Sequence, residues 1–449
     1  MSNRTRSART HRLVALAGAT VVTITAGWTG SGAAVGAVPA GTARVSVSGA
    51  GLQSDARSTR PAISADGRYV AFGSGARNLV PGDTNRRYDI FVHDRETGAI
   101  ERVSTGAGAA QADGASFSPA ISPDGRYVAF SSYATNLVPG DRNDDSDVFV
   151  VDRQAGTTTR VTVSSAGVEG DRYSSQASLS ADGRYVAFSS HASNLVPGDR
   201  NGSPDSFVHD LRLATTVRVS VSSDAVAGNG NSHSPSISAD GQVVAFFSLA
   251  SNIVADDTNR QSDVFVRSLA SGTTTRVSAS AGGVQGNGPS FGPSLSGDGR
   301  YVVFSSKAGN LVPADRKAND DVYLHDRTDG TLTQLSLTRA GGQTNGISKM
   351  PAIDASGRYV AYSSRASNVV PGDTNGTWDV FLLDRVTCSV SRVSVGAGGV
   401  QANGASAAIL DAGNATVATT GAVGYYSDAT NLVPDDTNGV SDIFVSDPG

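Results

Sequence analysis

Carboxylate and amide side chains recur along the 449-residue chain in the pattern Asp-x-Asn-x-x-x-Asp. Two carboxylates, an amide oxygen and nearby backbone carbonyls are the hard oxygen ligands that Ca²⁺ prefers. The copies that we consider as calcium ligands are Asp83, Asn85 and Asp89, then Asp141, Asn143 and Asp147, and finally Asp373, Asn375 and Asp379. However, the spacing is shorter than an EF-hand loop and lacks its terminal bidentate Glu. Asp and Asn also cap turns by binding backbone amides, so turn capping without a cofactor is the favoured interpretation, and calcium is the alternative.

A second group of side chains differs between copies that are otherwise alike, so the scaffold does not dictate them. One such position follows the second expected strand of each copy, and the other lies two residues before the usual Pro of the first strand. Aromatic and cationic residues at these positions can stack on sugar rings or pair with anionic groups. The candidate ligand-binding residues are Phe117, Tyr133, His191, His233, Phe291, Lys307, Lys349 and Arg365. Drift at unconstrained surface positions explains the same variation, and both interpretations stay open.

Catalytic signals are weak. His93, His209 and His325 occupy one repeat position in three different copies, so they cannot converge on a metal ion. The chain contains no His-Glu-x-x-His motif, and its many aspartates are explained by turns. We therefore predict no catalytic residue.

These residues are arranged by a repeat with a period of 58 residues, marked by the turn Ser-x-Asp-Gly. The marker residues are Asp66, Asp124, Asp182, Asp240 and Asp298, with Ser356 in the sixth copy. Each copy contains four short strand signals and no helical period, and Asp-Gly is typical of a tight hairpin between the first two. Four strands per repeat indicate one blade of a β-propeller.

The ends of the chain predict how the ring of blades closes. An Arg-Val-Ser signal for the fourth strand occurs first at Arg44, before any complete blade, and the last copy stops after its third strand at 442–445. The N-terminal segment can therefore supply the missing strand, which is a 1+3 clasp that leaves no long edge exposed. The predicted fold is all-β, a seven-bladed propeller of four-stranded antiparallel blades in one domain, residues 41–449. Strand alternation places the two longer connections of every blade on one side, the long-loop face, where we expect binding.

Residues 1–40 have a different composition from the repeats. Four arginines precede an apolar run and a stretch of small residues ending at Ala40, which is typical of a secretory signal peptide. We expect a released, extracellular monomer that does not insert into a membrane after cleavage, with association with the cell wall as an alternative. The formal charge is −5, and removing the four arginines leaves −9, which argues against a nucleic-acid partner.

The second copy reads Pro-Ala-Ile-Ser-Pro-Asp-Gly-Arg-Tyr-Val-Ala-Phe over 119–130 and continues with Asp-Val-Phe-Val-Val-Asp over 147–152. This sequence resembles the WD40-like (PD40) repeat of the TolB-like propeller family. The resemblance implies a propeller fold and, by similarity to periplasmic TolB, a protein-binding role. The N-terminal α/β domain of TolB and the hydrolase domain of propeller peptidases are not expected here. Our hypothesis is a secreted, non-enzymatic propeller that recognises a protein or cell-envelope ligand on its long-loop face. The alternative is a polysaccharide-active lyase or glycosidase with its site at the channel mouth.

Overall fold

The computed structural model describes residues 41–315, 319–407 and 416–448. The predicted signal peptide lies outside the described residues. Within them, no helix is long and apolar enough to cross a membrane. The regular structure is strands, apart from the short 3₁₀ turns η1 (Ala107–Ala109) and η2 (Ala397–Gly399).

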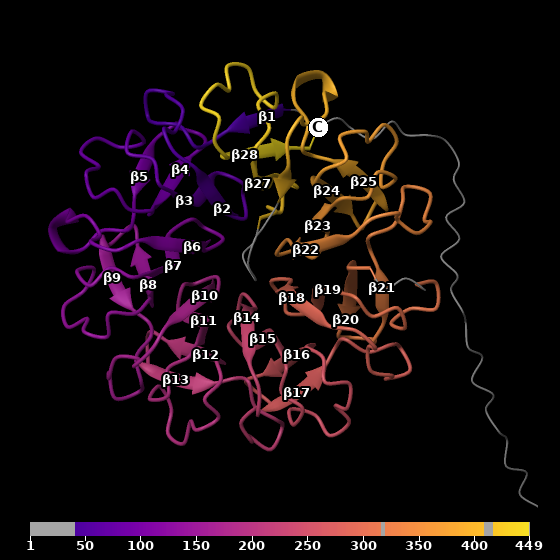
Figure 1. Ribbon diagram of the computed structural model, residues 1–449. Helices are drawn as coiled ribbons and strands as arrows, with labels where there is room; N and C mark the ends of the chain where they lie inside the picture. The colour runs from indigo at the N-terminus through magenta and orange to yellow at the C-terminus, as the bar shows by residue number, and fades with distance from the viewer. Residues whose placement is uncertain (1–40, 316–318, 408–415, 449) are drawn as a thin grey trace, which may run out of the picture. The chain divides into compact units, whose positions relative to one another are not determined.

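The strands form seven four-stranded antiparallel sheets, which confirms the predicted blades (Figure 1). Blade 1 consists of β2 (Ser58–Ile63), β3 (Tyr69–Ser74), β4 (Asp89–Asp94) and β5 (Ile100–Arg102). Blade 2 consists of β6 (Ser116–Ile121), β7 (Tyr127–Ser132), β8 (Asp147–Asp152) and β9 (Thr157–Arg160). Blade 3 consists of β10 (Ser174–Leu179), β11 (Tyr185–Ser190), β12 (Asp205–Asp210) and β13 (Thr215–Arg218). Blade 4 consists of β14 (Ser232–Ile237), β15 (Val243–Ser248), β16 (Asp263–Ser268) and β17 (Thr273–Arg276).

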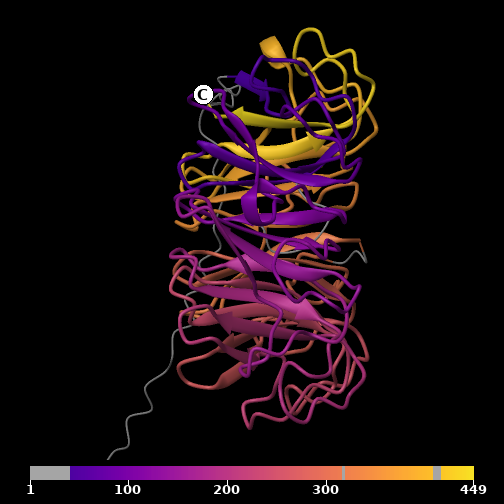
Figure 2. The same ribbon diagram turned by 90° about the vertical axis from the view of Figure 1, so that its left-hand side faces the viewer.

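Blade 5 consists of β18 (Ser290–Leu295), β19 (Tyr301–Ser306), β20 (Asp321–Asp326) and β21 (Leu332–Gln334). Blade 6 consists of β22 (Ser348–Ile353), β23 (Tyr359–Ser364), β24 (Asp379–Asp384) and β25 (Ser389–Arg392). Blade 7 consists of β26 (Ser406–Ala407), β27 (Val423–Ser427), β28 (Asp442–Asp447) and the N-terminal β1 (Gly41–Arg44). The first strand of each blade lies innermost in Figure 1, and Figure 2 shows the connecting loops on either side of the sheets.

The ring closes as predicted, because β1 pairs antiparallel with β28. Gly41 lies opposite Asp447 and Arg44 lies opposite Phe444. Just beyond β1, the Ser46 hydroxyl donates a hydrogen bond of 2.5 Å to Asp442. The closing blade therefore contains both ends of the described chain and presents no unpaired edge at β28.

The hydrophobic core lies between neighbouring blades. The second strands carry an apolar Tyr-Val-Ala-Phe type of sequence, and both faces of these strands are buried. Within a blade, the rings of the second and third strands pair, as Phe72 does with Phe91 at 5.9 Å between ring centroids. Equivalent pairs occur in all other blades, for example Tyr425 with Phe444 in blade 7. Since each sheet needs an apolar partner on both sides, every blade depends on its two neighbours.

The Asp-Gly turns do more than form hairpins, because their glycines also form the junction between blades. Gly183 of blade 3 has φ of +68°, and a Cβ added there would overlap the ring of Tyr127 in blade 2. The same arrangement places Gly125 against Tyr69, whose ring also lies 4.6 Å below the guanidinium of Arg153. A turn of one blade is therefore packed directly on the second strand of the preceding blade.

We expect Gly183→Ala to lower the free energy of unfolding by about 3 kcal/mol, since it adds overpacking to the cost of a left-handed Ala. The matched control is Gly198→Ala, where φ is +76° and a Cβ would meet no atom within 4 Å. That variant should lose only about 1 kcal/mol. Chemical denaturation measures both values, and equal losses would show that the blade junction does not require this glycine.

Candidate functional site

A β-bulge in the first strand of blades 1 to 6 shapes the mouth of the central channel on the long-loop face. In blade 1 the pairing of β2 with β3 shifts register between Thr59 and Ala62, and Arg60 has φ of +57°. The equivalent residues Ser118, Gln176, Ser234, Gly292 and Met350 all have φ between 53° and 61°. A bulge re-aims the side chains around it, so the residues beside it face the mouth instead of a neighbouring strand.

The backbone amide at one bulge is satisfied by side chains from the preceding blade. The Ser234 N–H donates to Gln176 Oε1 and to Ser189 Oγ, both at 3.1 Å. Neighbouring blades are therefore joined directly beneath the mouth, and the left-handed bulge residues are held in place by the ring.

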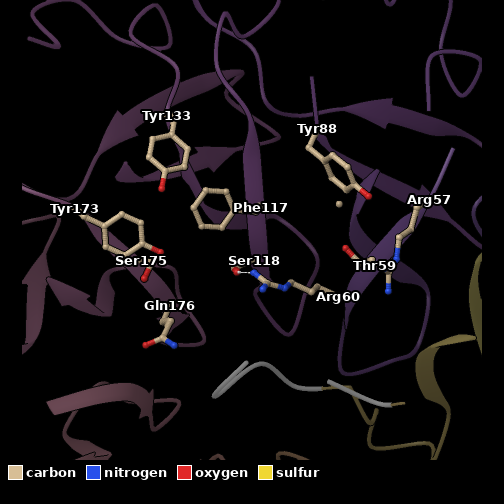
Figure 3. A pocket seen from close by; sticks show the side chains of 11 residues that line it. Arg57, Thr59, Arg60, Tyr88, Phe117, Ser118, Tyr133, Tyr173, Ser175 and Gln176 are labelled. Atoms are coloured by element: carbon tan, nitrogen blue, oxygen red, sulfur yellow. Dashed lines mark hydrogen bonds between the residues drawn. The ribbon is translucent and has the colours of Figure 1, made fainter. Parts of the chain in front are cut away.

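Between blades 1, 2 and 3 the mouth contains a cavity of about 440 Å³ (Figure 3). Its lining residues are Arg57, Thr59, Arg60, Gly73, Tyr88, Phe117, Ser118, Tyr133, Tyr173, Ser175 and Gln176. In Figure 3 the rings of Phe117, Tyr133 and Tyr173 stand on one side, and Tyr88 stands with Arg57 on the other. The cavity thus combines apolar ring faces, hydroxyl and amide groups, and guanidinium groups.

Aromatic rings continue from this cavity across blades 3 and 4. The ring centroids are separated by 5.6 Å from Phe117 to Tyr133, 6.3 Å to Tyr173 and 6.0 Å to His191. His233 follows at 6.4 Å, and Phe247 lies 5.7 Å further. We call these six residues the aromatic arc. Four of the predicted ligand-binding residues belong to it, while Tyr173 and Phe247 were not among the candidates.

The remaining candidates lie on blades 5 and 6. Lys307 and Arg365 are exposed, and Phe291 is partly buried on β18 opposite Ser305. The Lys349 ammonium lies 5.2 Å from the ring centroid of Trp378, within the range of a cation–π contact. Apart from Phe291, the predicted residues therefore separate into an aromatic side on blades 2 to 4 and a cationic side on blades 5 and 6.

A carboxylate that the sequence analysis did not select lies among these cations. Asp320 is 6% exposed, and its Oδ1 has no hydrogen-bond partner among the described residues. Burial raises the pKa of Asp320, while the charges of Lys307 and Lys349 act to lower it. Asp320 occupies the same repeat position as Tyr88 and Trp378, just before the third strand. Since that position also varies between copies, the variation that indicates the other candidates is present there too.

The three repeat histidines lie on β4, β12 and β20 of separate blades, so the prediction that they do not converge is confirmed. All three pKa values are lowered by burial, and His209 Nδ1 lies 2.8 Å from Thr216 Oγ1. Gly288, Ser290 and Gly292 match the spacing Gly-x-Ser-x-Gly, but this is no nucleophile elbow. Ser290 is fully buried at the start of a strand and bonds to Ser306 at 2.8 Å.

In the Asp-Asn loops the two carboxylates share an arginine of the fourth strand. In blade 1 the Arg102 guanidinium lies 3.3 Å from Asp83 and 3.9 Å from Asp89, and Asn85 donates to Asp89 at 2.8 Å. Arg160 and Arg392 pair in the same way in blades 2 and 6. A calcium ion in these loops stays a prediction, and it would have to compete with a guanidinium that already pairs with both carboxylates.

Blade 2 differs because it has Glu169 where five other copies have Gln53, Gln111, Gln285, Gln343 and Gln401. Carboxylate oxygens of Asp141, Asp147 and Glu169 lie within 4.8 Å of one another, around the single guanidinium of Arg160. Burial and then repulsion by Asp147 raise the pKa of Asp141 to about 7. Burial raises the pKa of Asp147 to about 6. The described part of blade 2 therefore holds more buried negative charge than its guanidinium can compensate.

We expect Glu169→Gln to raise stability at pH 8 by about 1 kcal/mol, because it removes one repelling charge from this group. A carboxyl whose pKa is 3.8 in the unfolded chain and about 7 in the folded protein gains stability as the pH falls below 7. The melting temperature of the wild type should therefore rise between pH 8 and pH 5, and that rise should be smaller in the variant.

The reverse change, Gln401→Glu in blade 6, is the matched control, since it recreates the blade 2 arrangement around Arg392. It should lower stability at pH 8 and introduce a similar pH dependence. If both variants have the pH profile of the wild type, the repulsion argued for Asp141, Asp147 and Glu169 does not operate.

Comparison with known proteins shows similarity of fold. No family model matches the chain, and no curated protein matches it. Similar solved structures include a protein described as TolB from Agrobacterium tumefaciens, 20% identical over 62% of this chain and 80% of that one, with a TM-score of 0.39. An oligogalacturonate lyase in complex with manganese is 12% identical over 91% of this chain and 93% of that one, with a TM-score of 0.53. The β-propeller domain of the Trilobed protease from Pyrococcus furiosus is 11% identical over 88% of this chain and 94% of that one, with a TM-score of 0.52.

The likeness to the lyase and to the protease domain, with TM-scores above 0.5, shows a shared fold and nothing finer. TolB-type propellers, which the repeat motif resembles, are among the similar structures. The chain is a seven-bladed β-propeller whose ring is closed by its N-terminal strand.

Proposed function

We propose that the protein is a secreted, monomeric, non-enzymatic binding propeller that holds a protein or cell-envelope ligand at the mouth on its long-loop face. The observation that carries this proposal is the aromatic arc. Tyr133 is 44% exposed, and it stands between the rings of Phe117 from blade 2 and Tyr173 from blade 3. Exposed aromatic surface gathered at a concave site is typical of a binding site.

The charges around the mouth indicate the polarity of the ligand. The chain outside residues 1–40 has a formal charge of −9. At the mouth, however, cationic groups outnumber carboxylates. The carboxylates are those of Asp145, Asp320 and Asp428, and the cationic groups are those of Arg57, Arg60, Lys307, Lys349 and Arg365. A local excess of positive charge on an acidic protein attracts an anionic ligand and raises its association rate.

The proposal predicts which side chains a captured ligand requires. Immobilised residues 41–449 should capture a component from culture or cell-wall fractions of the producing organism. Tyr133→Ala combined with Tyr173→Ala should reduce the amount captured at least tenfold, because it removes two stacking surfaces. Leu213→Ala, which changes an exposed side chain in a hairpin between third and fourth strands, is the control and should capture as the wild type does. Capture that is equal in all three proteins would place the binding site elsewhere.

A second candidate function is a polysaccharide-active enzyme, and Asp320 is the observation that favours it. This carboxylate lies at the mouth outside the repeated turn positions, and its raised pKa suits a proton-transferring group. Of the other mouth carboxylates, Asp428 lies two blades away and accepts a hydrogen bond from Ser441, and Asp145 lies on blade 2. Among the described mouth residues, Asp320 therefore has no second carboxylate on its own blade to act with it, so binding without catalysis remains our first proposal.

The two candidates differ in a turnover assay. An enzyme would shorten an acidic polysaccharide, with new chain ends detected as reducing sugar, and Asp320→Asn should lower that rate at least a hundredfold. We expect no chain shortening by the wild type. Shortening that Asp320→Asn abolishes would establish the enzymatic alternative.

A further inference from the structure

We propose that the ligand of the mouth is an acidic oligosaccharide, held at two subsites that lie across the mouth from each other. This inference rests on the proposed binding function and names the chemical class of its ligand. It is argued from the composition of each subsite.

The first subsite is the cavity between blades 1, 2 and 3. Its rings offer flat apolar faces, as the C–H faces of a sugar ring require, and Ser118, Ser175 and Gln176 offer donors and acceptors for hydroxyl groups. The guanidinium groups of Arg57 and Arg60 lie in the same wall. Arg60 already donates to Ser118, so the exposed Arg57 is the group that a carboxylate of the ligand can contact in bidentate fashion. One acidic sugar unit satisfies all three kinds of group.

The second subsite consists of Lys307, Asp320, Lys349 and Trp378 on blades 5 and 6. Trp378 supplies a ring face, the two lysines supply donors, and Asp320 supplies an acceptor. Asp320 is 6% exposed, and a sugar hydroxyl can donate to this exposed edge while a neighbouring acidic group of the ligand pairs with the lysines.

An acidic peptide fits this subsite less well than a saccharide does. Its side-chain carboxylates would suit the lysines as those of an acidic sugar do, but they carry no hydroxyl that can donate to Asp320 and no ring that can stack on Trp378. A neutral saccharide would satisfy Asp320 and leave the cations of both subsites without anionic partners. An acidic oligosaccharide is the ligand class that meets the aromatic, carboxylate and cationic groups together.

The two subsites are built from different blades, so a single sugar unit cannot occupy both. Tyr88 of the first subsite and Asp320 and Trp378 of the second occupy one repeat position in blades 1, 5 and 6. Between the subsites the aromatic arc continues over blades 3 and 4 as a series of stacking surfaces. An oligomer with acidic groups along its length can therefore contact both sides.

Isothermal titration of residues 41–449 with three probes tests this assignment: a uronic acid hexasaccharide, cellohexaose and poly-L-glutamate. We expect saturable binding of the uronic acid hexasaccharide, at least tenfold weaker binding of cellohexaose, and at least tenfold weaker binding of poly-L-glutamate. Asp320→Asn and Trp378→Ala should each weaken binding of the hexasaccharide at least fivefold. Arg200→Gln, a loss of charge in an exposed loop of blade 3, is the control and should bind as the wild type does.

Thermal melts confirm that each variant is folded, and Asp320→Asn keeps the shape of the side chain. Tighter binding of poly-L-glutamate, or equal binding of cellohexaose, would overturn the assignment to an acidic saccharide. Unchanged affinity in Asp320→Asn and Trp378→Ala would remove the second subsite. If none of the probes binds while the aromatic variant still loses the captured component, this inference fails and the proposed function stands. If the aromatic variant also captures normally, both fail.

Discussion

The structure depends on one packing constraint, which is that each blade is apolar on both faces and no blade can bury both by itself. The fully buried rings of Phe72, Phe91 and their equivalents lie in layers that neighbouring blades cover. A linear array would leave two such faces in water, whereas a closed ring leaves none. The pairing of β1 with β28, which lie far apart in the sequence, is the contact that turns the array into a ring. The Gly-Tyr junctions and the hydrogen bonds between neighbouring inner strands then fix each blade against the next.

This constraint separates scaffold from site. Residues that meet a neighbouring blade must be the same in every copy, as the turn glycines nearly are. At the mouth the inner strands diverge from regular pairing at their bulges, and the side chains there face solvent instead of another blade. Aromatic residues gather on blades 2 to 4, and cations gather on blades 1, 5 and 6. A regular ring thereby carries an asymmetric binding surface.

Sequence alone was sufficient for the fold, since period, turn chemistry and the displaced Arg44 strand predict the blades, their number and their closure. For the site it was sufficient only in part. Variation between copies predicts Phe117 and Tyr133, but Tyr173 and Asp320 lie at other repeat positions. Asp320 directly precedes Asp321, one of the repeated carboxylates, and so resembles a member of that set in the sequence. The pairing of Arg102 with Asp83 could not be read from spacing, because the hairpin between β4 and β5 brings these residues together.

The central claim is that ligand binds at the mouth, and the protein contains its own reporter there. The chain has two tryptophans, Trp28 within residues 1–40 and Trp378, so residues 41–449 carry Trp378 as their single tryptophan. The most direct measurement is the tryptophan emission of residues 41–449 during titration with the uronic acid hexasaccharide, alongside calorimetry. Our account predicts a saturable change in intensity or wavelength with the same Kd as the heat signal. Saturable heat with unchanged emission would mean that the ligand binds away from Trp378 and would contradict the account.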